Sequence, residues 1–209
     1  MQKLIYQEEL TYRFHPNETE NIRFVVHGCN TGCLYYDSWV TVFFTGNQET
    51  ERLACDVLYE KISNLFYLLE KSLNQENKVD EQHIPDIGLF FNEMHYKKSM
   101  LYETISSNEL YKHVVWSPIF KWGDIQTWLY SNTHGETILF LAPVYPFFHT
   151  KRENQHASYT RWMKTYKPFA RRIISRDIAE KWLKQAGDII NLIETNSATR
   201  SEELAKEQT

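Results

Sequence analysis

The sequence predicts an α+β fold, with mostly antiparallel sheets, one helix after the first strands (about 57–73) and C-terminal helices packed on the sheet. Three observations lead to this class. Strand-like segments occur in runs before and after the first helix, which favours antiparallel pairing. Apolar residues recur at helical spacing directly after Cys55. The last third of the chain is helical again, so the strand–helix alternation of a parallel sheet is missing.

Composition predicts a single domain over residues 1–196, followed by a polar, disordered tail over 197–209. A chain of 209 residues buries enough surface to form a core without disulfides or metal. The 7 Gly and 6 Pro are too few for long flexible linkers. Aromatic residues make up 15% of the chain, and we expect most of them in the core and some at an interface.

The first strands follow from alternating apolar residues. Strands are expected at 10–14, 21–27, 34–44 and 49–55, the last two joined by a hairpin at Gly46-Asn47. Both faces of 34–44 are apolar or aromatic. This pattern predicts a central strand that is covered on both sides.

The rest of the chain divides into helices and short strands. Asp56 is the expected N-cap of the first helix, and 74–82 is expected to be a loop. The further predicted strands are 85–91, 99–104, 109–116, 125–130 and 136–142. The further predicted helices are 158–166, which ends before Pro168, and one capped by Ser175. The residues expected to be buried together are Trp39, Val42, Ile62, Leu65, Leu69, Leu139, Phe140, Leu141, Trp182 and Ile189.

Cysteine usage and hydropathy predict a cytoplasmic protein without membrane contact. Three cysteines are an odd count, unlike a secreted disulfide framework. The N-terminus lacks a signal-like apolar run, and no stretch approaches the roughly 18 apolar residues of a membrane span. We therefore expect reduced cysteines.

The segment from His27 to Cys33 is the most metal-like part of the sequence. Its imidazole and two thiolates, at Cys29 and Cys33, supply three of the four ligands that zinc needs. The spacing is not that of a standard zinc finger, and no second cluster follows. A glycine-rich turn between two strands explains the same residues, so we expect no metal and no other cofactor.

Candidate site residues come from two segments. His149, Arg152, His156 and Arg161 follow a buried strand, where a general base and a cationic stabiliser are often placed. An ordinary solvated loop is the alternative interpretation. Asp37 and Trp39 belong to an aromatic strand, where the acid marks either a site or a strand edge. No dinucleotide, phosphate-loop or zinc-protease motif is present.

Charge is divided unevenly along the chain. Residues 1–148 carry a net charge of −8, and residues 149–184 carry +7. The basic segment 149–176 includes Arg171 and Arg172, with aromatic residues between its cations, a composition that suits nucleic acid. The alternative is internal pairing between this segment and the acidic remainder of the domain.

Three classes of function remain open from the sequence. The first expectation is a non-catalytic intracellular protein-binding module, and its concrete form is the immunity protein of a bacterial toxin, which masks the toxin's active site. This is an analogy of type and rests on the acidic charge, the aromatic load and the missing motifs. The alternatives are a nucleic-acid binder using 149–176 and an enzyme with a dispersed site near His149 and His156. The oligomeric state is not predicted.

Overall fold

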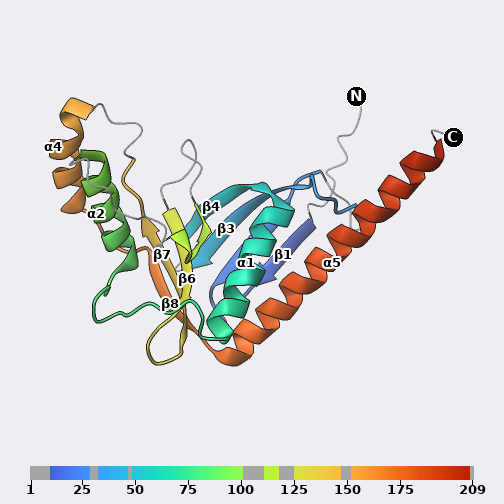
Figure 1. Cartoon of the computed structure of the whole chain (residues 1–209), viewed down its shortest axis with the longest axis horizontal. Coiled ribbons are helices and arrows are strands. Elements are labelled where there is room, and N and C mark those ends of the chain that lie inside the picture. Colours follow the sequence, from blue (N-terminus) through green and yellow to red (C-terminus); the bar gives the residue numbers. More distant parts are fainter. Residues whose placement is uncertain are drawn as a thin grey trace.

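The computed structural model describes residues 10–28, 33–46, 49–100, 111–117, 125–146 and 152–207. This part of the chain forms two four-stranded antiparallel sheets and four helices, which confirms the α+β class (Figure 1). The elements are β1 (Leu10–Phe14), β2 (Asn21–Val26), β3 (Trp39–Gly46), β4 (Glu49–Val57), α1 (Leu58–Leu73), α2 (Ile87–Met100), β5 (Val114–Trp116), β6 (Ile125–Ser131), β7 (Thr137–Pro143), α4 (Arg152–Met163), β8 (Ala170–Ile174) and α5 (Arg176–Glu207). Within these ranges no helix is both long and apolar enough to cross a membrane.

The first sheet has the strand order β1-β2-β3-β4 and packs one face against α1 and α5. Alternate residues of its strands point to that face, because side chains of a strand alternate between its two sides. Phe24 lies opposite Val42 in the register, and both are fully buried. Phe14 meets Trp182 of α5 with ring centroids 5.7 Å apart. These contacts join the sheet to the C-terminal helix.

Strand β3 is shorter than predicted, because it begins at Trp39 and not at residue 34. Residues 35–38 form a turn in which the Ser38 backbone N–H donates to the Tyr35 carbonyl oxygen. Trp39 is 47% exposed, so its predicted place in the core was wrong. Its neighbour Val40 points to the buried face, and the strand alternation therefore turns Trp39 to the opposite face.

Helix α1 confirms the predicted helix and forms the centre of the main core. Its buried residues, Leu58, Ile62, Leu65, Leu68, Leu69 and Ser72, contact both sheets and α5. Asp56 is not the N-cap, since the helix starts after Val57 and no side chain caps it. The Asp56 carboxylate instead accepts the Val57 backbone N–H and pairs with Lys61 at 2.8 Å.

The second sheet has the order β5-β6-β7-β8 and is covered on both faces. Leu129, Leu139 and Leu141 face α1 in the main core. Trp128 and Phe140 face α2 in a second core cluster. Phe140 is therefore buried as predicted but lies apart from the other predicted core residues, eight of which share the main core. The continuous apolar run at 138–141 reflects this burial on both sides.

The predicted strand 85–91 is wrong, since residues 87–91 are helical. Helix α2 starts at Ile87, after Asp86, whose carboxylate accepts the Leu89 backbone N–H at 2.8 Å as an N-cap does. Gly88 lies against β7, where an added Cβ would come within 2.6 Å of the Ala142 Cβ. The apolar residues that resemble a buried strand are thus the face of a helix packed closely on the sheet.

Three other boundaries differ from the prediction. Of the predicted strand 109–116, residues 109 and 110 lie outside the described ranges, and among the rest only β5 is a strand. The predicted strand 99–104 begins inside α2, and its residues beyond Met100 lie outside the described ranges. The predicted helix 158–166 is α4, which starts earlier and ends at Met163. Strand β8 was not predicted, because its two arginines interrupt the apolar pattern.

The polar segment from residue 197 onward is helical as far as Glu207, where we expected a disordered tail. Helix α5 runs past the body of the protein toward the C-terminus (Figure 1). Its final turns are rich in Ala, Glu and Lys, which favour helix even when they are exposed. Ser197 is 9% exposed and packs on the domain, while residues 201–206 are exposed.

Candidate functional site

Residues 35–39, the aromatic turn, connect the loop after β2 to β3. The Tyr35 backbone N–H donates to the Ser38 hydroxyl at 2.8 Å, and the Ser38 carbonyl accepts the Leu58 backbone N–H at 2.8 Å. The first bond closes the turn on itself, and the second ties it to the first residue of α1. The turn is therefore held both by its own hydrogen bond and by α1.

The far half of α5 holds the other side of the aromatic turn. The Tyr36 backbone N–H donates to the Ser197 hydroxyl at 3.2 Å. The Arg200 guanidinium lies 4.7 Å from the centre of the Tyr35 ring and 3.8 Å from an Asp37 carboxylate oxygen. A cation over an aromatic face is attracted by the ring quadrupole. The helix thus fixes a loop from the opposite end of the sequence.

The aromatic turn presents two large side chains to solvent. Tyr36 is 48% exposed and meets the Tyr59 ring edge-on, with centroids 4.8 Å apart. The Tyr59 hydroxyl donates to Glu194 of α5 at 3.0 Å, and this bond to a carboxylate raises the pKa of the Tyr59 hydroxyl. Trp39 donates its indole N–H to the Cys55 sulfur at 3.1 Å. Both exposed rings therefore have a partner that limits their motion.

Asp37 and Trp39 are two predicted site residues that both lie exposed on the aromatic turn. The side chain of Asp37 is 78% exposed, beside the exposed Trp39. Sequence reasoning missed the residues that support them, namely Tyr36, Tyr59, Glu194, Ser197 and Arg200. The run Tyr-Tyr-Asp-Ser-Trp was the available signal, but it was assigned to a strand expected to be covered on both sides.

The other predicted site residues are spread over two further places. His149 lies outside the described residues, and the Arg152 side chain is likewise not described. His156 and Arg161 are on α4, where the His156 Nδ1 is bonded to the Tyr96 hydroxyl of α2. Arg171 and Arg172 are on β8. The predicted site residues of the basic segment whose side chains are described are therefore not gathered into one site.

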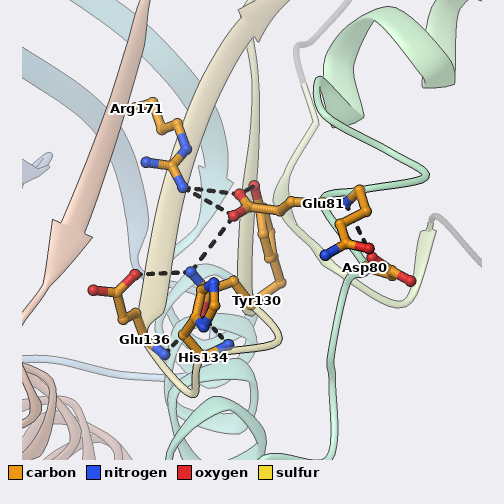
Figure 2. A network of polar contacts seen from close by, with 8 residues as sticks. Asp80, Glu81, Tyr130, His134, Glu136 and Arg171 are labelled. Atoms are coloured by element: carbon orange, nitrogen blue, oxygen red, sulfur yellow. Dashed lines mark hydrogen bonds and ion pairs between the residues drawn. The ribbon is translucent and has the colours of Figure 1, made fainter.

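Arg171 belongs to the polar network shown in Figure 2. Its Nη2 donates to both carboxylate oxygens of Glu81, at 2.9 and 3.1 Å. The Tyr130 hydroxyl donates to the same carboxylate at 3.0 Å, and burial together with the Glu81 charge raises the pKa of that hydroxyl. Asn132 links the network to Glu136 at 2.8 Å. The network pins the 80–81 segment to the second sheet.

Arg172 pairs on the opposite side of β8. Its Nε and Nη2 donate to the two carboxylate oxygens of Glu20, whose side chain is only 4% exposed. Glu20 precedes β2 in the first sheet, so the pair joins the two sheets. Both arginine charges are thus neutralised by carboxylates of the acidic part of the chain.

The described residues do not support a metal site in the segment from His27 to Cys33. Across the described ranges, no three His, Cys, Asp or Glu side chains are close enough to hold a metal ion. Cys55 is a free thiol there, and Cys29 lies outside those ranges. The His27 Nε2 lies 2.7 Å from the Thr41 hydroxyl.

Comparisons with known proteins return no relative. No family model matches the chain, no curated protein matches it, and no solved structure matches its fold. The candidate site is therefore argued from its own geometry.

Proposed function

We propose that this protein is a non-catalytic protein-binding module, and that its partner docks on the aromatic turn. The observation that carries the proposal is the pair of exposed rings, Tyr36 and Trp39, held in place by α1, α5 and Cys55. Tyr and Trp are the residues most enriched among those that dominate binding energy. Rings that are already fixed lose little entropy on binding, which raises the affinity they supply.

The two rings are close enough to serve one partner. They are three residues apart, so their Cα atoms are at most about 11 Å apart along the chain. A standard interface covers about 800 Å² on each partner, which spans this distance easily. Trp39 stands on the outer face of the first sheet, and Tyr36 stands beside α1. A partner seated on this end of the sheet contacts both.

The charge around the aromatic turn favours a basic partner. Asp37, Glu60 and Glu194 are exposed carboxylates on the turn and on the helix positions beside it. The cation Arg200 lies beside these carboxylates and contacts Asp37. The chain as a whole carries a net charge of −4. Complementary charge accelerates association and suppresses wrong partners. The toxin-immunity role is the specific form of this proposal.

The nucleic-acid alternative loses two of its main residues. Arg171 and Arg172 are engaged by Glu81 and Glu20, so phosphate contacts at these positions require breaking an ion pair. Arg161, Lys164 and Lys167 remain exposed from the basic segment. No observation favours this function over protein binding.

The test uses the intact protein as bait in extract of its native cell, followed by identification and purification of what it captures. Binding of the purified partner is then measured by calorimetry. We expect Trp39→Ala and Tyr36→Ala each to weaken binding at least about 30-fold, the effect of an interface hot spot. Asp37→Lys should slow association with a basic partner.

Tyr67→Ala is the matched control, since Tyr67 is a 53% exposed tyrosine on α1 whose ring contacts Lys71. It should leave binding and melting temperature unchanged. If the Trp39→Ala and Tyr36→Ala variants bind the partner as tightly as the parent protein does, the proposal is overturned. Capture of nucleic acid alone, lost in an Arg161→Glu, Lys164→Glu variant, would replace it with the alternative.

A further inference from the structure

A pocket of about 520 Å³ opens between the two sheets, at the end where their inner faces meet. The described residues that line it are Phe44, Gly46, Glu49, Ile125, Pro143, Lys167, Pro168, Phe169 and Arg172. Its size falls in the range of small-molecule sites, about 300–1,000 Å³. Such sites combine apolar and aromatic groups with a few charges, and this lining includes two phenylalanines, two prolines and three charged residues.

Each sheet supplies one wall of this intersheet pocket. Gly46 and Glu49 are paired across the hairpin of β3 and β4, so Glu49 points to the same face as the buried Gly46. Ile125 and Pro143 are paired across β6 and β7. The Phe169 ring meets the Phe44 ring edge-on, with centroids 5.8 Å apart. Two aromatic rings therefore close the pocket where the sheets meet.

Within the described part of the chain, two of the three charged side chains in the lining form no ion pair. Arg172 is already neutralised by Glu20. Lys167 and Glu49 are exposed, and among the residues described neither forms an ion pair. A pocket that combines apolar side chains with one available cation and one available carboxylate matches a ligand that carries both charges and an apolar body.

We propose that the intersheet pocket binds a free α-amino acid with an aromatic side chain. Its carboxylate lies at Lys167, its ammonium lies at Glu49, and its ring packs against Phe169. Aromatic rings prefer edge-on or offset contacts with other rings, which Phe44 and Phe169 provide. A residue inside a peptide carries neither backbone charge, so the charge pattern favours the free amino acid over a peptide segment.

Calorimetry on the whole protein tests this with three probes of similar shape: L-phenylalanine, 3-phenylpropionate, which lacks the ammonium, and phenethylamine, which lacks the carboxylate. Because each charged contact is worth about 10- to 100-fold in affinity, L-phenylalanine should bind at least about tenfold tighter than either analogue. Absence of saturable binding of L-phenylalanine, L-tyrosine and L-tryptophan up to about 10 mM would overturn the proposal.

Two variants assign the charges separately. Lys167→Ala should weaken L-phenylalanine and 3-phenylpropionate about tenfold and leave phenethylamine unchanged. Glu49→Gln should weaken L-phenylalanine and phenethylamine and leave 3-phenylpropionate unchanged. Lys164→Ala, an exposed lysine outside the pocket lining, should change none of the three. Lys167 and Glu49 are both exposed, so the melting temperatures of their variants should match that of the parent protein. If either variant weakens all three probes equally, or weakens none of them, the assignment of charges is contradicted.

Discussion

Arg172 and Glu20 are 152 residues apart in sequence and form a two-bonded ion pair that joins the two sheets. The preceding residue, Arg171, points to the other side of β8 and pairs with Glu81. Neighbouring residues of a strand face opposite sides, so two adjacent cations hold two different parts of the fold. The basic segment thus stabilises the tertiary structure at both points.

Replacing Arg172 should destabilise the protein, because Glu20 would remain as a buried carboxylate without its cation. We expect Arg172→Leu to lower the free energy of unfolding by about 2–3 kcal/mol, near the low end for a buried pair since Arg172 is partly exposed. Urea denaturation measures this. Arg176→Leu is the control, since its pair with Glu180 is exposed and should contribute under about 0.5 kcal/mol. Equal losses in the two variants would contradict the role given to Glu20.

Acid should weaken the fold through the same pair. The hydrogen bonds from Arg172 hold the pKa of Glu20 below its ordinary value in the folded chain. At mildly acidic pH the unfolded chain therefore binds more protons at this carboxyl. The stability that this pair contributes is fully present above the ordinary pKa of the Glu20 carboxyl. It is lost as pH falls from about 5 through the pKa of Glu20 in the folded chain. Urea melts at stepped pH measure the slope, and Glu20→Gln should remove part of it.

His113 should make stability pH-dependent in a higher range. It is 2% exposed, and desolvation lowers the pKa of its imidazole from 6.5 to about 4. Between these values the unfolded chain takes up a proton that the folded chain does not. Stability should therefore fall as pH drops from about 6.5 to about 4, by at most about 3 kcal/mol.

Proton NMR checks this directly, since the His113 ring signal should not titrate above about pH 5. In urea denaturation at stepped pH, His113→Gln should remove this dependence of the unfolding free energy on pH. His15→Gln, which replaces an exposed histidine, should retain it. A His113 signal that titrates near pH 6.5 would contradict the burial.

Two truncations of α5 should distinguish how its exposed end and the part that contacts the aromatic turn contribute to stability. Removal of residues 202–209 deletes the exposed helical residues 202–206 and should leave the melting temperature within error. Removal of residues 197–209 also deletes Ser197 and Arg200, which hold the aromatic turn. We expect that truncation to lower the melting temperature by a few degrees, as a loss of about 1 kcal/mol does in a domain of this size. Thermal melts that coincide for both truncations would show that the turn does not need α5.

Leu65 is fully buried in the main core, between α1 and the sheets. Leu65→Ala should cost about 2–5 kcal/mol, because it removes apolar contacts and leaves a cavity. Tyr67→Ala, at an exposed position two residues further along α1, should cost under about 0.5 kcal/mol. Urea denaturation of both variants compares them within one helix.

Local sequence patterns predicted the helices and strands whose apolar residues follow one clear pattern. The helical stripe of α1 was recognised because its buried residues recur at helical spacing, and the apolar run of β7 was recognised because six of its seven residues are buried. Residues 85–91 show the limit of this method. A short apolar segment fits a strand or a packed helix equally, and the capping bond of Asp86 decides for the helix.

Of the candidate site, the sequence supplied Asp37 and Trp39 but not their setting. Ser197 and Arg200 lie more than 150 residues away, and no local pattern links them to the aromatic turn. The intersheet pocket could not be predicted either, because its walls come from two sheets that meet only in the folded chain.

The sequence by itself determined the α+β class, the central helix and the uneven charge, because these follow from residue type and from periods of a few residues. Only the tertiary structure decided that Trp39 faces solvent and that Arg171 and Arg172 pair with Glu81 and Glu20. The physical reason is the same in both cases. Strand alternation fixes which side chains share a face, but packing between distant segments decides what covers that face.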